Sequence, residues 1–350
     1  MQYKKRNIIS RLIGVVLSIA SISITSSSCE RIFEDLDPCA HGVSLRFIYD
    51  YNMEYANSFP KKVDCLTLYI YDDKGNYIDT KTVTGTALQD EDYRMTLDLE
   101  KGNYHFVAYG GLACEKNTFS VVRKPENGSK DTDLQVKMDL NRVTASIPAD
   151  RRLHDLFWGE LTLSTADLYQ EGTVKMMKNT NNIRIVLQQE NGGKVDVDDF
   201  EFMITDNNSL FDGRNDLITE NIPPVTYTPW TTGQAQTGVS IVGNQVAPEA
   251  VVVAYAELST SRLMKKNSPK LIIRRKADGA TIVDFPLINY LTLLRSDYYT
   301  QPPYNMKDDQ EYLDRESDYV LFFFLRPDQS WLDTRIVVND WVVRINNAEL

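Results

Sequence analysis

Apolar and polar residues alternate along much of the chain, at the two-residue period of half-buried β-strands. The pattern begins with Val43, Leu45, Phe47 and Tyr49, which are separated by mostly polar side chains. Turn-forming residues divide the segments that follow, and this spacing predicts a β-sandwich rather than alternating strands and helices. The further strands expected in this half are Val63–Tyr71, Tyr77–Val83, Tyr93–Leu99, Tyr104–Tyr109, Phe119–Val122 and Leu134–Leu140.

A second series of strands is expected after residue 173. Its members are Ile183–Leu187, Val195–Ile204, Val251–Leu258, Leu271–Arg275, Thr281–Phe285, Val320–Leu325 and Ile336–Ile345. The stretch from Asp206 to Gly243 is rich in Asn, Pro, Thr and Gly, and we expect a loop there. Helix is sparse, with one short helix at Pro286–Leu294 and a turn near Asp308–Arg315. The chain is therefore predicted to be all-β, with two sandwich domains in tandem at residues 41–172 and 173–350.

The first 28 residues have the composition of a bacterial export signal. Its four basic residues are Lys4, Lys5, Arg6 and Arg11. The apolar run Leu12–Ile24 is shorter than the roughly 20 residues that span a bilayer as a helix. Two interpretations fit Ser27-Ser28-Cys29: a secretory signal followed by an ordinary cysteine, or a lipoprotein signal in which Cys29 is acylated. We favour the second, because a cysteine at that distance from a small-residue cleavage site is uncommon.

Net charge excludes one class of partner. The formal charge is −11, from 38 basic and 49 acidic residues, and it becomes −15 when residues 1–28 are removed. A nucleic acid needs a basic surface, so nucleic-acid binding is excluded, and charge alone would not hold the chain on anionic lipid. The segment at residues 29–40 is rich in acid and resembles the tether of surface-exposed lipoproteins of Bacteroidota.

Three cysteines remain if Cys29 is acylated, namely Cys39, Cys65 and Cys114. An odd number allows at most one intrachain disulfide, and the sequence does not show whether any two of them pair. No Cys-x-x-Cys spacing suggests a metal site. We expect these residues to be small buried hydrophobic side chains.

Signatures of catalysis are missing from the sequence. It has no Gly-x-Ser-x-Gly motif, no phosphate-binding glycine loop and no His-Glu-x-x-His. The histidines, His41, His105 and His154, have no partner at ligand spacing, and packing is the expected role of His105. The acidic loop Asp206–Asp216 lacks the calcium-binding order of an EF-hand. We therefore predict no enzyme activity, no cofactor and no metal.

Glycan binding at the cell surface is the alternative function. Aromatic side chains can form a platform for sugars, although aromatic residues at strand spacing are more often part of a core. Trp230 lies in a proline-rich stretch and is the tryptophan that we expect to be exposed. The others are Trp158, Trp331 and Trp341.

Several ordered blocks of sequence resemble the FimB family, the fimbrial anchor lipoproteins of Bacteroidota. The resemblance spans nearly the whole chain after the signal. The blocks in the first half are Gly42–Phe47, Tyr49–Met53, Val63–Asp72 with Gly75, and His154–Gly159. Those in the second half are Leu258–Leu263, Pro286-Leu287, Gln310–Glu316 with Tyr319–Leu325, and Asn339–Ile345.

This resemblance implies two transthyretin-like β-sandwich domains, anchored by lipid on Cys29 at the outer membrane. It further implies a protein that holds a fimbrium at the cell surface and affects its assembly and length. The implied partners are fimbrial shaft or accessory subunits, with no small-molecule substrate and no catalytic residue.

Fimbrial subunits of this kind are thought to join by adding a β-strand to a neighbour's sheet, so that main-chain hydrogen bonds supply affinity. The predicted strand Ile336–Ile345 is the candidate for such contacts. Burial in a core is the stronger explanation of its apolar residues. The candidate contact residues are Ile336, Val338, Trp341, Val343 and Ile345.

Overall fold

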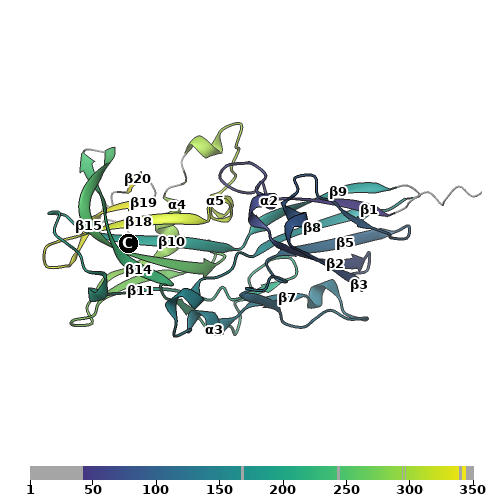
Figure 1. Ribbon diagram of the computed structural model, residues 1–350, viewed down its shortest axis with the longest axis horizontal. Coiled ribbons are helices and arrows are strands. Elements are labelled where there is room, and N and C mark those ends of the chain that lie inside the picture. The colour runs from purple at the N-terminus through teal and green to yellow at the C-terminus, as the bar shows by residue number, and fades with distance from the viewer. Residues whose placement is uncertain are drawn as a thin grey trace, which may run out of the picture.

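The chain folds into an elongated all-β molecule in which the two halves of the sequence lie end to end (Figure 1). This computed structural model describes residues 42–166, 169–242, 245–293, 295, 297–338 and 341–343. No helix in these ranges is long and apolar enough to cross a membrane.

The first half is built on a seven-stranded sheet with the order β3-β2-β5-β8-β9-β1-β4. One face of the sheet encloses a core that includes Leu45, Leu68, Phe106 and Val174. The strands are β1 (Val43–Ile48), β2 (Cys65–Asp72), β3 (Tyr77–Thr84), β4 (Met95–Leu97), β5 (Asn103–Gly110), β8 (Phe157–Ser164) and β9 (Gln170–Lys178). Alternation in the sequence produces this arrangement, because every second side chain of β1 is buried.

The second half is a sandwich of a six-stranded and a four-stranded sheet, ordered β14-β15-β10-β18-β19-β20 and β13-β11-β16-β17. Ile185 and Phe323 of the first sheet share one core with Phe202 and Ile273 of the second. The larger sheet contains β10 (Thr180–Gln189), β14 (Thr231–Val242), β15 (Gln245–Ser261), β18 (Asp318–Leu325), β19 (Trp331–Val338) and β20 (Trp341–Val343). The smaller sheet contains β11 (Phe200–Asp206), β13 (Val225–Tyr227), β16 (Lys270–Arg275) and β17 (Thr281–Pro286).

A three-stranded sheet joins the halves. It consists of β6 (Phe119–Val121), β7 (Gln135–Met138) and β12 (Leu210–Asp212), so β12 of the second half pairs with β7 of the first. Its side chains pack with Tyr71 and Tyr109, which lie on the other face of the seven-stranded sheet from the core described above. The core that they form continues into the second half. The halves are therefore in direct contact over a hydrophobic surface.

Helices are short among the described residues. The α-helices are α2 (Phe59–Lys62), α3 (Leu140–Val143), α4 (Leu287–Thr292) and α5 (Asp309–Arg315). The 3₁₀ turns are η1 (Thr86–Gln89), η2 (Asp131–Asp133), η3 (Pro148–Arg151), η4 (Val197–Asp199) and η5 (Asp297–Thr300).

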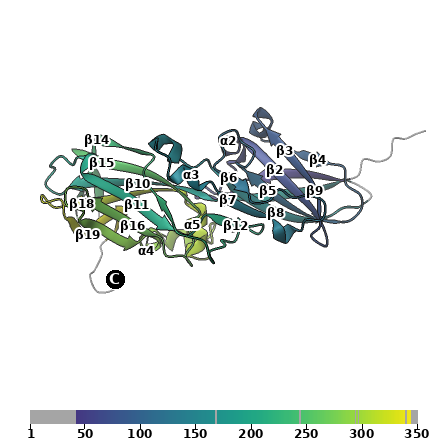
Figure 2. The same ribbon diagram turned by 90° about the horizontal axis from the view of Figure 1, so that it is seen from below.

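Strand directions fix which parts lie at opposite ends of the molecule. Strand β1 runs parallel to β9, with Val43 beside Gln170, and β9 leads through Asn179 into β10 of the other half. Val43 is therefore at the end of the first half that points away from the second. Strands β14, β15 and β19 lie at the other end of the long axis (Figure 2).

The all-β prediction is confirmed, whereas the transthyretin-like arrangement stays a prediction. The predicted domain boundary, between residues 172 and 173, falls inside β9. The expected loop from Asp206 to Gly243 is wrong, because β12, β13 and β14 lie within it. Ile336–Ile345 is not one strand: β19 and β20 form an antiparallel pair, with Ile336 opposite Val343.

Candidate functional site

The C-terminal strands form one edge of the six-stranded sheet. β19 pairs with β18 and β20 pairs with β19, so β20 is the edge strand within the described part of the chain. Trp331 begins β19, and its ring centroid lies 6.0 Å from that of Phe323 and 6.1 Å from that of Phe285. The start of this hairpin is thereby fixed to the core of the second half.

The candidate contact residues can be placed by backbone register. Ile336 and Val338 lie on β19, opposite Val343 and Trp341 on β20. Ile345 and the proposed lipidation residue Cys29 are outside the described residues. The structure thus brings four of the five candidates into one edge hairpin.

Two of the sequence blocks that resemble the fimbrial anchors meet through a buried ion pair. Arg262, just after β15, contacts Asp314 of α5 by two hydrogen bonds of 2.8 Å. The side chains are 11% and 7% exposed, so solvent screens the pair only weakly. Arg262 also donates to the carbonyl of Asn215, and Gln310 donates to Asp314 at 2.9 Å. These blocks therefore have a structural role in fixing α5 against the sheet.

A cleft of about 710 Å³ lies where the halves meet, and Tyr51, Tyr55 and Arg315 are among the residues that line it. Arg315 lies between the two tyrosines, with its guanidinium carbon 4.1 and 4.2 Å from their ring centroids. Its Nε is 2.8 Å from Glu311. Burial raises the pKa of Tyr51 to about 12, so its phenol is neutral at physiological pH. Stacking of an arginine on tyrosines stabilises this junction.

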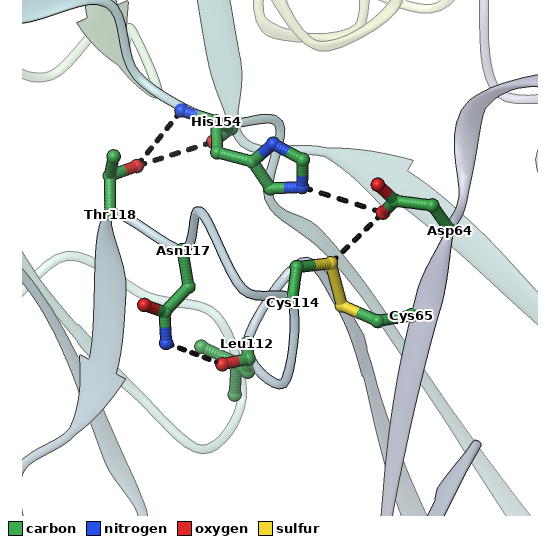
Figure 3. Close-up of a disulfide and its surroundings, with 7 residues drawn as sticks. All are labelled: Asp64, Cys65, Leu112, Cys114, Asn117, Thr118 and His154. Carbon is green, nitrogen blue, oxygen red and sulfur yellow. Dashed lines mark hydrogen bonds and ion pairs between the residues drawn. A yellow bond between two sulfur atoms is a disulfide. The ribbon is translucent and has the colours of Figure 1, made fainter. Parts of the chain in front are cut away.

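Cys65 and Cys114 form a disulfide, with Cα atoms 5.4 Å apart (Figure 3). The expectation that these cysteines are plain buried hydrophobic side chains is wrong. Strand β2 and the loop after β5 bring together residues 49 positions apart, a pairing that sequence spacing does not reveal. Cys39 is outside the described residues.

Asp64 lies beside the disulfide, with one carboxylate oxygen 2.9 Å from Cys114 Sγ and 3.4 Å from His154 Nε2 (Figure 3). In the described ranges, three side chains with possible metal-ligating atoms lie close to one another, namely Asp64, Cys65 and Cys114. Disulfide sulfurs carry no thiolate, so this group does not fit a metal ion.

His105 and Trp230 make contacts that the sequence did not predict. His105 lies between Glu160 at 3.0 Å and Asp131 at 3.5 Å, carboxylates that are distant in the sequence. Trp230 is half-buried rather than exposed, and Arg152 lies 4.8 Å above its ring. His41 and the side chain of Trp341 are outside what the structure describes.

Three solved structures with the same fold as this chain are described here. A candidate adhesin from Bacteroides thetaiotaomicron is 60% identical, with a TM-score of 0.80 over 89% of this chain and 100% of that one. A candidate polysaccharide-binding protein from the same organism is 29% identical, with a TM-score of 0.71 over 88% and 99%. The fimbrial anchor protein Mfa2 from Porphyromonas gingivalis is 13% identical, with a TM-score of 0.63 over 87% and 99%, and shows the fold. No curated protein sequence matches this chain.

The sequence profile of one family covers residues 36–347, almost the whole chain. This family is described as the fimbrillin-A associated anchor proteins Mfa1 and Mfa2, and it is structural rather than enzymatic. The match agrees with the resemblance seen in the sequence blocks and supports a fimbria-associated role at the cell surface. The chain therefore belongs to the fimbrillin-A associated anchor protein family.

Proposed function

We propose that this protein anchors a fimbrium to the outer membrane through acyl chains on Cys29, and takes part in fimbrial assembly and length control. The family match over residues 36–347 carries the proposal. Several acyl chains on one cysteine hold a protein on a membrane lastingly, since each buried CH₂ contributes about 0.8 kcal/mol. The acidic segment at residues 29–40 then acts as a tether between the membrane and β1.

Contact with a fimbrial subunit is assigned to the edge hairpin of β19 and β20. An edge strand presents unpaired main-chain N–H and C=O groups that a partner's strand can complete. Val43, which follows the tether, lies at the far end of the first half, so the second half extends away from the membrane in this arrangement. Such a polarity suits an anchor whose partner lies outward.

Binding to fimbriae purified from the same bacterium tests the proposal. The immobilised full-length chain is expected to bind them, and a chain that ends after Val338 is expected to bind at least ten-fold more weakly. This truncation removes β20 and leaves β19 paired with β18, and its circular dichroism spectrum checks the fold. Unchanged binding by the folded truncation would remove the hairpin from the interface, and no binding by the intact chain would overturn the anchor function.

Lipid attachment needs its own test. Metabolic labelling with radioactive palmitate is expected to label the wild-type chain, and Cys29→Ala is expected to abolish the label and the partition into outer membranes. A Cys29→Ala chain that still sediments with outer membranes contradicts the lipid anchor.

Polysaccharide binding is the second candidate function, and two observations favour it. A relative that is 29% identical is named for polysaccharide binding. The cleft between the halves is also lined by Tyr55, Trp158 and Tyr304, and aromatic rings can stack on sugars. A glycan array distinguishes the candidates: binding that is lost in Tyr304→Ala supports the glycan function, and an array without signal removes it.

A further inference from the structure

A paired segment of β14 and β15 extends beyond the rest of its sheet. Strand β15 pairs with β10 only from Ala254 to Ser261, whereas its pairing with β14 continues as far as Val242 opposite Gln245. Two strands therefore project together beyond the end of β10, and we call residues Gly238–Val242 and Gln245–Ala250 the distal arm. Figure 1 shows them rising from the left-hand end of the molecule, opposite β1.

The base of the distal arm is fixed to the sheet by one buried side chain. Gln188 of β10 donates to the carbonyl of Val239 at 2.8 Å, and its own carbonyl accepts from the Val239 N–H at 2.9 Å. Its side-chain amide thus satisfies both main-chain groups of Val239, although β14 and β10 are not neighbouring strands. The distal arm leaves the sheet in a defined direction because this contact lies at its start.

The distal arm carries almost no charge. Residues 231–256 contain a single charged residue, Glu249, although a quarter of the whole chain is charged. Gln245, Ala247 and Ala250 are exposed, so uncharged surface faces solvent here. Proteins usually protect an open strand edge with charged residues or a covering element. Among the described residues β14 pairs with β15 alone, so its other edge is open apart from Val239, whose N–H and C=O bond Gln188.

An isolated two-stranded ribbon gains little stability of its own in water, and an uncharged one with an open edge also favours association. The proposed anchor function places the outward subunit at the end opposite Val43, where β14 and β15 lie (Figure 2). Strand β15 also contacts β20 of the proposed hairpin interface. A strand of such a subunit can pair with β14 by main-chain hydrogen bonds at residues other than Val239, whose N–H and C=O bond Gln188. An uncharged surface also avoids the repulsion that an acidic chain exerts on an acidic partner.

We propose that the distal arm and the open edge of β14 bind an extended, uncharged strand of the neighbouring fimbrial subunit. The inference rests on the proposed anchor function and adds a second contact surface to the hairpin of β19 and β20. Two contacts on one subunit would strengthen binding well beyond either alone.

Binding of purified fimbriae to the immobilised full-length chain tests the inference. The double variant Ala247→Lys with Ala250→Lys places charge on the distal arm, and the double variant Thr86→Lys with Ala87→Lys is the matched control on exposed η1 of the first half. We expect the double variant to lose about ten-fold or more in affinity, the size of effect typical of residues central to an interface. The control should stay within two-fold, and thermal unfolding checks that both variants fold.

A second variant keeps the test independent of those two side chains. Replacing residues 241–246 by Asn-Gly, a pair suited to a two-residue hairpin turn, keeps Ser240 opposite Ala247 and Val239 opposite Pro248, and so keeps the Gln188 contacts. It should lose as much affinity as the charged variant. Wild-type affinity in both arm variants would overturn the inference and leave the anchor function intact, whereas an intact chain that binds no fimbriae overturns both. If the variants instead dissolve a dimer of this chain, the occupant is a second copy and the inference is wrong.

Discussion

Arg262 and Asp314 make the ion pair whose loss should destabilise the molecule most clearly. Asp314→Asn leaves a buried guanidinium without its carboxylate, and breaking a buried pair from one side typically costs about 3–5 kcal/mol. We expect urea unfolding to show a loss in this range. Asp284→Asn is the control, because the Lys270–Asp284 pair is about half exposed and such pairs contribute about 0–1 kcal/mol. Equal stabilities of the two variants would contradict the structural role of the pair.

Asp206 predicts a pH dependence of stability. Burial raises the pKa of its carboxyl to about 6. Between about pH 4 and 6 the folded chain holds a proton that the unfolded chain has released, so the Asp206 contribution to the free energy of unfolding falls as pH rises. Full ionisation costs on the order of 3 kcal/mol.

The variant Asp206→Asn isolates this effect, since its side chain keeps the oxygen that accepts from Asn207 and Asn267 and cannot ionise. Its unfolding free energy minus that of the wild type is expected to increase from pH 4 to pH 7. A difference that stays constant over this range means that Asp206 does not titrate in the folded chain.

Contacts between individual side chains could not be predicted from the sequence. The sequence shows Leu258–Leu263 and Gln310–Glu316 as separate blocks, and only the fold brings Arg262 to Asp314, 52 positions away. The disulfide has the same origin, because three cysteines allow several pairings and spacing does not choose among them.

Strands with regular alternation could be predicted, and strands created by pairing could not. β1, β2 and β5 alternate clearly or are densely apolar, and they lie close to the predicted segments. β14 contains glycine, glutamine and threonine, which are typical of a loop. It is a strand because β15 pairs with all of its residues except Thr237. The apolar residues of the C-terminal segment predict a strand, but they do not reveal that the segment turns back on itself.

Gln188 tests how the distal arm is fixed as an element. Gln188→Ala removes both hydrogen bonds to Val239, and each such bond contributes about 0.5–1.5 kcal/mol. We expect the Val239 amide to exchange its hydrogen roughly ten-fold faster or more, as measured by nuclear magnetic resonance. Gln189→Ala should leave this rate unchanged, because its side chain contacts the carbonyl of Arg326 instead. Equal exchange in wild type and Gln188→Ala would mean that the arm is fixed by other contacts.

At the scale of the whole molecule, the structure is elongated, and its two halves are joined by several direct contacts. One residue, Asn179, separates β9 from β10, the three-stranded sheet crosses between the halves, and Arg315 stacks on Tyr51 and Tyr55. The all-β class and the anchor family could be predicted from the sequence. The crossing sheet could not, because β12 lies in a stretch that looks like a loop and its partner is in the other half.

The amount of fimbriae released into the culture medium tests the anchor function most directly. Cells that lack this gene are supplied with the wild-type chain or with Cys29→Ala, and fimbriae are measured on the cells and in the medium. We predict that wild type keeps fimbriae on the cells, whereas Cys29→Ala and the empty control release them. Fimbriae that stay on the cells without a lipidated chain would contradict the account.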